Sequence, residues 1–432
     1  MNVIIHRGSR QIGGSCLEVF TDKARIILDI GAELPPIGEK NTGRGENRSQ
    51  GKEREFGRGQ TESGINENQP GREAKPIDAL IISHGHGDHI GLIQDIYPDI
   101  PVFIGEKALH IYHMTGKFTG KNIIPNPTSY LQSGKEFVIG DLNITPYLVD
   151  HSGFDSYAFL IRQGKKTLVY TGDFRDHGRK KKATDYFIDK LPEGMDLLLI
   201  EGTMMTRGAE KVATEETIEN EAYTFMKSQG GPVFVLQSST NIDRLVGMYR
   251  AAKRSGRIFV MDIFTANIVA GLNNTIPQPG IFKDVRVFYP YYLTKKMFKE
   301  PGGEYLMRRF SQYKITREEL TKRKDYCMLV RDSMLSDLQH IKNLHGAGFI
   351  YSLWSGYKGE IRVQEILDYA KQMVMKIIAL HTSGHISRES LGKMIDKIKP
   401  RKVVPIHTEN PYIFAKEFPN VYLPQDGEII SV

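Results

Sequence analysis

One short segment constrains the fold of this chain more than any other. An apolar run at residues 79–83 is followed at once by His84-Gly85-His86-Gly87-Asp88-His89. Imidazole nitrogens and carboxylate oxygens are ligands of zinc and similar ions. Three histidines and one aspartate at this density are hard to explain as unrelated surface residues, so the segment predicts a metal-binding loop after a buried strand. We expect Gly85 and Gly87 to let the backbone turn tightly, so that the ligands converge.

Further candidate ligands stand where other apolar runs end. Asp150-His151, Thr171-Gly-Asp173 and Pro405-Ile-His407 each close or follow a run of β-branched and apolar residues. Side chains at the ends of neighbouring strands can meet at one edge of a sheet. We therefore expect these residues to complete a site that begins with the histidine-rich loop.

Length and charge limit the classes of protein to consider. A chain of 432 residues is long for one compact core and predicts two domains, or one domain with an insertion. A formal charge of +7 favours an acidic partner such as nucleic acid, although the same charge also serves solubility alone. The distant Cys16 and Cys327 predict neither a disulfide scaffold nor a thiolate zinc site. The chain shows no signal peptide and no apolar run long enough to span a bilayer, so we expect a cytoplasmic protein without a membrane segment.

The pattern of apolar residues changes twice along the chain. The first part is predicted to hold strands at residues 24–29, 79–83, 102–104, 143–150, 156–162, 167–170 and 195–201, with helices at 90–97 and 106–115. From about Thr214, helices at 215–228 and 241–254 alternate with strands at 232–237, 257–262, 285–289, 327–330 and 348–352, which predicts an α/β unit with a mainly parallel sheet. The end returns to the first pattern, with a strand at 376–380, a helix at 387–398 and a strand at 402–407.

One segment differs in composition from the rest. Residues 38–75 contain eight glycines, eight basic and seven acidic residues, and almost no apolar side chains. Such a segment cannot bury enough surface to offset its ordering entropy, so we expect a flexible insertion. Because its charges nearly cancel, an RNA-binding tail is not indicated.

The order of these motifs resembles the metallo-β-lactamase superfamily. The resemblance rests on the HxHxDH loop, the single His151, the Thr-Gly-Asp173 stretch, and Asp29 in Ile-Leu-Asp-Ile-Gly. It implies an αββα sandwich with two divalent metal ions, Zn²⁺ or alternatively Mn²⁺. It implies one ion on His84, His86 and His151, a second on Asp88, His89 and His407, a bridging Asp173, and a supporting role for Asp29.

Two further stretches resemble the β-CASP nucleases of that superfamily. Glu201 in Leu-Leu-Leu-Ile-Glu-Gly-Thr, His385 in Thr-Ser-Gly-His, and His407 fall on the motifs called A, B and C. The resemblance implies that residues 1–203, with the 38–75 insertion, form the first part of the metallo-β-lactamase domain. An inserted α/β β-CASP cap then follows at 204–365, and the domain is completed by 366–432. The residues that could contact substrate are Ser383, Asn241 and Arg244, the last two in a stretch that resembles ribonuclease J.

The chain also departs from ribonuclease J. The Ser-Gln-Gly-Glu-Pro stretch typical of those enzymes is replaced at residues 352–360, and the glutamate of motif A is closer to the endonuclease subunit of the mRNA 3′-end cleavage complex. The sequence ends at Val432 without a C-terminal dimerisation domain. Exonuclease or endonuclease action, and a homodimer, therefore stay open.

The resemblance implies hydrolysis of phosphodiester bonds in nucleic acid. RNA is favoured by kinship alone, because attack by water makes no use of the 2′-hydroxyl. Asp88, Glu201 and His385 would be the catalytic residues, with His385 as the proton donor and Glu201 orienting it. The alternatives are a small-molecule ester or thioester hydrolase, a DNA nuclease, and a non-catalytic binding protein.

Overall fold

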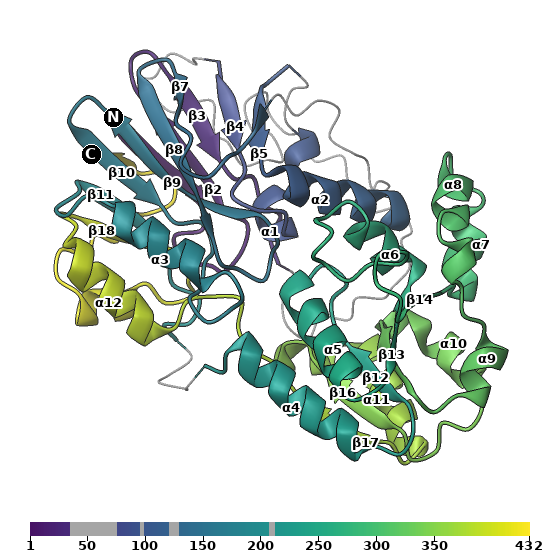
Figure 1. Ribbon diagram of the computed structural model, residues 1–432. Coiled ribbons are helices and arrows are strands. Elements are labelled where there is room, and N and C mark those ends of the chain that lie inside the picture. Colours follow the sequence, from purple (N-terminus) through teal and green to yellow (C-terminus); the bar gives the residue numbers. More distant parts are fainter. Residues whose placement is uncertain (35–75, 96–98, 121–128, 207–211) are drawn as a thin grey trace.

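The computed structural model describes residues 1–34, 76–95, 99–120, 129–206 and 212–432. The charged segment 38–75 lies outside the described residues. The chain forms two lobes, one built on a pair of sheets and one on a single sheet with helices on both sides (Figure 1).

The first sheet of the larger lobe has the strand order β19-β1-β2-β3-β4-β5-β6. Its strands are β19 (Ile429–Ser431), β1 (Asn2–Arg7), β2 (Cys16–Phe20), β3 (Arg25–Leu28), β4 (Ala79–Ile81), β5 (Val102–Ile104) and β6 (Ser129–Tyr130). The strands from β19 to β3 pair antiparallel, and β3, β4, β5 and β6 pair parallel. The N-terminal strand is thus held by the most C-terminal strand.

The second sheet has the order β18-β11-β10-β9-β8-β7. Its strands are β18 (Val403–Ile406), β11 (Leu197–Glu201), β10 (Lys166–Tyr170), β9 (Ser156–Gln163), β8 (Leu142–Val149) and β7 (Phe137–Ile139). Because β10, β11 and β18 pair parallel and β8 and β10 both pair antiparallel with β9, these four strands run in one direction. Their carboxyl ends therefore lie along one edge of the sheet.

The two sheets enclose the main apolar core of this lobe. Side chains that alternate along the strands meet between them, such as Ile5, Leu28 and Ile81 from one sheet and Phe159 and Leu199 from the other. Helices α3 (Lys181–Lys190) and α12 (Arg388–Ile398) pack on the outer face of the second sheet, and α1 (Gly87–Ile90) and α2 (Glu106–Thr119) on that of the first. The predicted αββα sandwich is confirmed.

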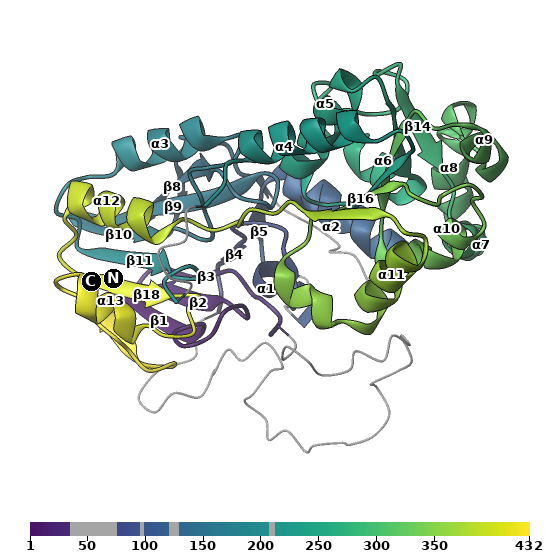
Figure 2. The same cartoon turned by 90° about the horizontal axis from the view of Figure 1, so that it is seen from below.

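The second lobe is a sheet in which every pairing is parallel, as predicted for the α/β block. Its order is β14-β13-β15-β12-β16-β17, with β14 (Val285–Phe288), β13 (Ile258–Asp262), β15 (Tyr326–Val330), β12 (Val233–Leu236), β16 (Gly348–Tyr351) and β17 (Lys376–Ala379). All of these strands except the edge strand β17 are almost fully buried, and helices cover both faces of the sheet (Figures 1 and 2). The helices are α4 (Glu215–Ser228), α5 (Ile242–Arg254), α6 (Ile263–Val269), α7 (Tyr291–Met297), α8 (Gly303–Arg308), α9 (Arg317–Lys322), α10 (Leu335–Gln339) and α11 (Ile361–Gln372).

The third sheet continues past the predicted domain boundary at 365/366. That boundary falls inside α11, and β17 pairs in parallel with β16 through four residue pairs. The third sheet therefore extends to Ala379, although the strand at 376–380 was predicted to belong to the returning part of the chain. The division of the chain into domains stays a prediction, and β17 favours a junction near residue 380.

Local sequence explains where the longer helices begin. Thr214, Asn241 and Ser387 each accept a hydrogen bond from a backbone N–H in the first turn of the helix that follows, as a capping residue does. The predicted helix at 90–97 is wrong in part, because α1 ends at Ile90 and a 3₁₀ turn at Ile93–Asp95 follows. Among the described residues, no helix has the length and apolar character needed to span a bilayer.

Candidate metal centre

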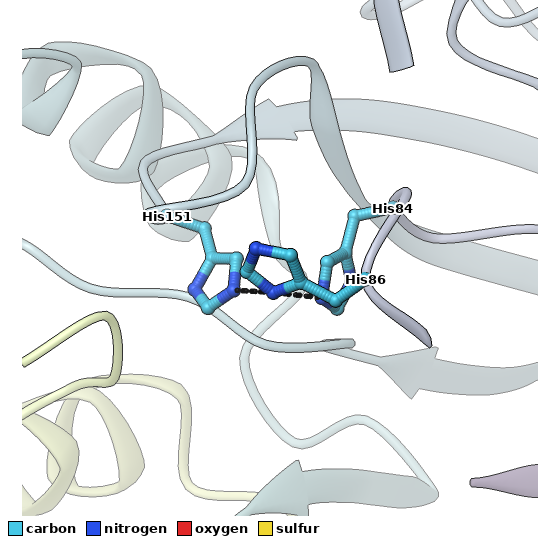
Figure 3. Close-up of side chains that lie close together, drawn as sticks. All are labelled: His84, His86 and His151. Carbon is cyan, nitrogen blue, oxygen red and sulfur yellow. Dashed lines mark hydrogen bonds between the residues drawn. The ribbon is translucent and has the colours of Figure 1, made fainter. Parts of the chain in front are cut away.

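The histidine-rich loop connects β4 to α1 at the edge where the strands of both sheets end. His84 is fully buried and His86 is the residue before α1, where its side chain makes no capping bond. Nδ1 of His86 lies 3.2 Å from Nε2 of His84 and 3.2 Å from Nε2 of His151, which follows β8 (Figure 3). Burial lowers the pKa of all three histidines, so the neutral ring with a free lone pair is favoured. A metal ion requires this form of the ring.

A second cluster lies beside the first. It consists of Asp88, His89, Asp173 and His407, whose candidate ligand atoms all lie within 4.8 Å of one another. Oδ2 of Asp173 is 3.1 Å from Nε2 of His89 and 3.9 Å from Nε2 of His84, so this carboxylate stands between the two clusters. Oδ1 of Asp173 is buried and has no hydrogen-bond partner among the described residues. An orphaned carboxylate oxygen among imidazoles is a position that a cation fits.

The remaining ring nitrogens are held by neighbours, as those of metal-binding histidines usually are. This fixes which nitrogen of each ring faces the clusters. Nδ1 of His151 donates to the Gly384 carbonyl at 2.6 Å, and Nδ1 of His89 donates to Asp29 at 2.8 Å. The hydroxyl of Thr203 lies 2.9 Å from Nδ1 of His407.

Asp29 supports the loop, in the position expected for it. It is fully buried, and its oxygens accept from the Ser83 amide at 2.6 Å, the Ser83 hydroxyl at 2.7 Å and the Tyr170 hydroxyl at 2.5 Å. Its backbone φ of +57° is a conformation that side chains rarely adopt outside turns and functional sites, and His407 shares it at +50°. Asp29 and the candidate ligand His407 are thus both held in a strained backbone conformation.

The explanation expected for Gly85 and Gly87 is wrong. Neither has a positive φ, and a Cβ at Gly87 would meet nothing within 4 Å. One glycine whose size the loop requires is Gly31, where a Cβ would lie 1.7 Å from the carbonyl oxygen of Asp88. In the Thr-Gly-Asp stretch, Gly172 does have a positive φ, of +52°.

His385 and Glu201 lie at the rim of the second cluster. Nδ1 of His385 is 3.2 Å from Glu201 and 3.7 Å from Asp173, and its ring stacks on that of His407 at 5.6 Å. Burial alone would lower the pKa of His385, but the carboxylates of Glu201 and Asp173 outweigh it and raise the pKa. Glu201 is fully buried and accepts from the amides of Phe174 and Thr203, so its carboxylate is fixed in place.

The three predicted substrate contacts have different surroundings. Ser383 lies in the site, where its hydroxyl accepts from the His385 amide at 3.1 Å. The Asn241 side chain caps α5. A substrate contact by Arg244 is not compatible with this conformation. Its side chain is fully buried, and its bonds go to Glu215, Ser352 and the Leu380 carbonyl.

Sequence reasoning missed a buried ionic cluster behind the site. Arg175, two residues after Asp173, is fully buried and bonds to Asp150 at 3.1 Å, Glu215 at 3.2 Å and Asp243 at 2.9 Å. It also donates to the Ser383 carbonyl at 2.9 Å. The cluster ties the loops of His151, Asp173 and His385 to helices α4 and α5 of the second lobe. The charged residues Asp150 and Arg175 stand next to the candidate ligands His151 and Asp173 in the sequence. Their partners Glu215 and Asp243 are distant in sequence, so the cluster could not be predicted from them.

Comparison with known proteins finds two family matches, each over part of the chain. Residues 57–224 match the family described as "Beta-lactamase superfamily domain", and residues 371–417 match "Zn-dependent metallo-hydrolase RNA specificity domain". The second match includes His385 and His407.

Curated relatives resemble the chain at low identity over much of its length. The "RNase J-like protein" of Methanocaldococcus jannaschii is 24% identical and covers 94% of this chain and 91% of its own length. "Ribonuclease J" of Pyrococcus abyssi is 21% identical, covering 98% and 96%. "Ribonuclease J" of Sinorhizobium meliloti is 22% identical over 79% of this chain, which spans only 60% of that relative's length.

A solved structure shares the fold. It is described as a protein of unknown function from Enterococcus faecalis and matches with a TM-score of 0.78 at 22% identity over 99% of both chains. The motif order, the sandwich with its inserted parallel sheet and the two family matches together support the metallo-β-lactamase β-CASP, ribonuclease J-like family.

Proposed function

We propose that this protein is a metal-dependent ribonuclease. The observation that carries the proposal is the bridging place of Asp173 between two His/Asp clusters, with the His385–Glu201 pair at the rim of the second. The match of residues 371–417 to an RNA specificity domain, and relatives named as ribonucleases J, support RNA as the substrate.

His84, His86 and His151 would hold one ion, and Asp88, His89 and His407 the second, with Asp173 shared. Imidazole and carboxylate ligands suit Zn²⁺, and Mn²⁺ is the alternative. When bound, two such ions supply an activated water molecule and neutralise charge on a phosphate.

The protein's own residues would manage the proton of the leaving oxygen. The carboxylates around His385 keep its ring protonated to higher pH than an ordinary imidazole, so it can donate a proton. Glu201 orients that ring through Nδ1, which leaves Nε2 to face the substrate. Asp88 lies 3.3 Å from Nε2 of His407 and would fix both side chains as ligands.

We also propose that the protein works in the cytoplasm, where Cys16 and Cys327, both buried and free, would stay reduced. Light scattering of the purified protein tests whether it forms a homodimer.

The decisive experiment uses end-labelled single-stranded RNA and DNA of one sequence, each with a 5′ monophosphate or triphosphate, in Zn²⁺ or Mn²⁺. We expect cleavage of RNA, no cleavage by His86→Ala, and loss of bound metal in that variant. His345→Ala, an exposed histidine, is the matched control and should be fully active. Hydrolysis of simple thioesters with no cleavage of either nucleic acid would refute the proposal in favour of a small-molecule hydrolase. A preference for DNA would make the protein a DNA nuclease.

A further inference from the structure

The turn that carries His385 is held by side chains and loops from several parts of the chain. Residues 380–387 lie between β17 and α12, in neither a helix nor a strand, so tertiary contacts must fix their backbone. Each residue of the stretch 382–385 has such a contact. Their partners are, in order, the Ala213 carbonyl, the side chains of Arg175 and His177, Nδ1 of His151, and the carboxylate of Glu201.

The Ser383 carbonyl accepts two of these bonds. Nη1 of Arg175 and Nε2 of His177 each donate to it at 2.9 Å. A carbonyl oxygen has two lone pairs and can only accept, so both lone pairs are used and Nε2 of His177 carries its hydrogen. Arg175 is fully buried and His177 is 8% exposed. The carbonyl is therefore fixed from two sides, away from solvent.

The side chain of His177 makes this one hydrogen bond. Its Nδ1 is buried and has no hydrogen-bond partner among the described residues, because the Asp176 carboxylate is 3.6 Å away. The backbone carbonyl of His177 accepts from the Glu215 amide at 3.0 Å, which holds the main chain against α4. Burial of an imidazole costs free energy that a single bond offsets only in part, so the bond to Ser383 calls for a functional explanation.

A shift of Ser383 would move the proposed proton donor. The Ser383 hydroxyl accepts from the His385 amide at 3.1 Å, so this serine is joined to His385 through its side chain as well as through the backbone. The ring of His385 must keep Nδ1 at 3.2 Å from Glu201 for its other nitrogen to face the substrate. A displacement of about 1 Å can cost a reaction on the order of a hundredfold in rate.

We propose that His177 is a positioning residue for the reaction, which holds the Ser383 carbonyl and thereby sets the place of the His385 ring. The inference rests on the proposed ribonuclease function, which it deepens by giving a role to a residue that is neither a candidate ligand nor a proton donor. His177 affects the rate through His385, and it should have little effect on substrate binding.

Two substitutions separate the hydrogen bond from the bulk of the side chain. His177→Leu removes the donor, and Ser383 should stay in a folded protein because its carbonyl still accepts from Arg175. His177→Gln places an amide nitrogen as many bonds from the backbone as Nε2 of histidine, so it can restore the donor. The control is His340→Leu, which removes the bond of an exposed histidine to the Ser336 carbonyl in the second lobe. Circular dichroism and metal content check folding and loading.

Cleavage of single-stranded RNA is measured at saturating metal. We expect His177→Leu to lower kcat on the order of tenfold or more, and to change KM by less than about threefold, because the loss lies in the placement of a reacting group. His177→Gln should recover most of kcat, and His340→Leu should match the wild type. In a His385→Ala background, His177→Leu should lower kcat no further, because both changes remove the same contribution.

Wild-type kcat in His177→Leu, an equal loss in His177→Leu and His177→Gln, or a full further loss in the His385→Ala background would each overturn the inference. Absence of RNA cleavage by the wild type would instead refute the ribonuclease proposal. In that case nuclear magnetic resonance of the labelled histidine rings still tests the positioning. The ring signals of His385, identified by their absence in His385→Ala, should move in His177→Leu and return in His177→Gln, and unmoved signals in His177→Leu refute the role.

Discussion

His385 shows how much of a residue's role depends on one neighbour. Its Nδ1 faces the buried carboxylate of Glu201 at 3.2 Å, and it also belongs to a group that could itself hold an ion, with Asp173 and His407. Substitution of a proton donor should lower the rate and leave the metal bound, whereas substitution of a metal ligand should lower both the rate and the metal content. Kinetics and metal content separate the two roles.

We predict that His385→Ala lowers kcat about a hundredfold or more, the usual contribution of a general acid, with metal content retained. Glu201→Gln removes the nearest negative charge, so the pKa of His385 should fall and the alkaline limb of the pH–rate profile should move to lower pH. Rate measured against pH, with metal content measured in parallel, checks both. A loss of metal that parallels the loss of rate in His385→Ala would assign His385 as a ligand instead.

Buried ion pairs join helices α4 and α5 to the strand ends of the other lobe. Arg175 reaches Glu215 of α4 and Asp243 of α5, and Lys180 adds a second contact to Asp243 at 3.0 Å. Arg175, Glu215 and Asp243 are almost fully buried, so each carboxylate depends on its partner.

We predict that Arg175→Met lowers the free energy of unfolding by about 3–5 kcal/mol, because it leaves buried carboxylates without their partner. Arg175→Lys should recover little of this, since an ammonium group cannot bond to three carboxylates in the geometry of a guanidinium. The exposed pair of Arg308 and Glu304 provides the control, and Arg308→Met should change stability by less than about 1 kcal/mol. Urea titration measures all three, and equal losses in Arg175→Met and Arg308→Met would contradict the prediction.

The elements that the sequence predicts best are those with a strong local signal. Residues 215–228 form a helix with the predicted bounds, because Thr214 caps it and acidic residues fill its first turn. Helices α6 to α10 have five to seven residues each, too few for a helical period to stand out, and none was predicted. β17 was predicted as a strand but placed in the wrong part of the fold, because its partner β16 is not a local property of its sequence.

At the scale of the whole molecule, the sequence predicts the site through motifs at strand ends. The residues proposed as ligands all lie in two adjoining clusters, because parallel strands bring their carboxyl ends to one edge. Arg244 shows the limit of this reasoning. Its partners Glu215 and Leu380 are 29 and 136 residues away, so its burial could not be inferred from the helix start in which it lies.

Bound ions would join the two sheets, since the histidine-rich loop follows the first sheet and His151, Asp173 and His407 follow the second. We predict that a chelator speeds amide hydrogen exchange at the carboxyl ends of β4, β8, β10 and β18 far more than in β12, β15 and β16 of the other lobe. Mass spectrometry of exchanged fragments, with and without Zn²⁺, measures this. Uniform changes in both lobes would show that metal binding stabilises the molecule as a whole and not the joint between the sheets.

The position of β18 beside β11 has a consequence for the life of the protein in the cell. Glu201 and His407 end neighbouring strands but are 206 residues apart (407 − 201), so the whole second lobe is synthesised between them. A chain emerging from the ribosome lacks β18, His385 and His407 until the second lobe has been synthesised. For the proposed ribonuclease, this order means that the site cannot be complete before the second lobe and β18 have been synthesised.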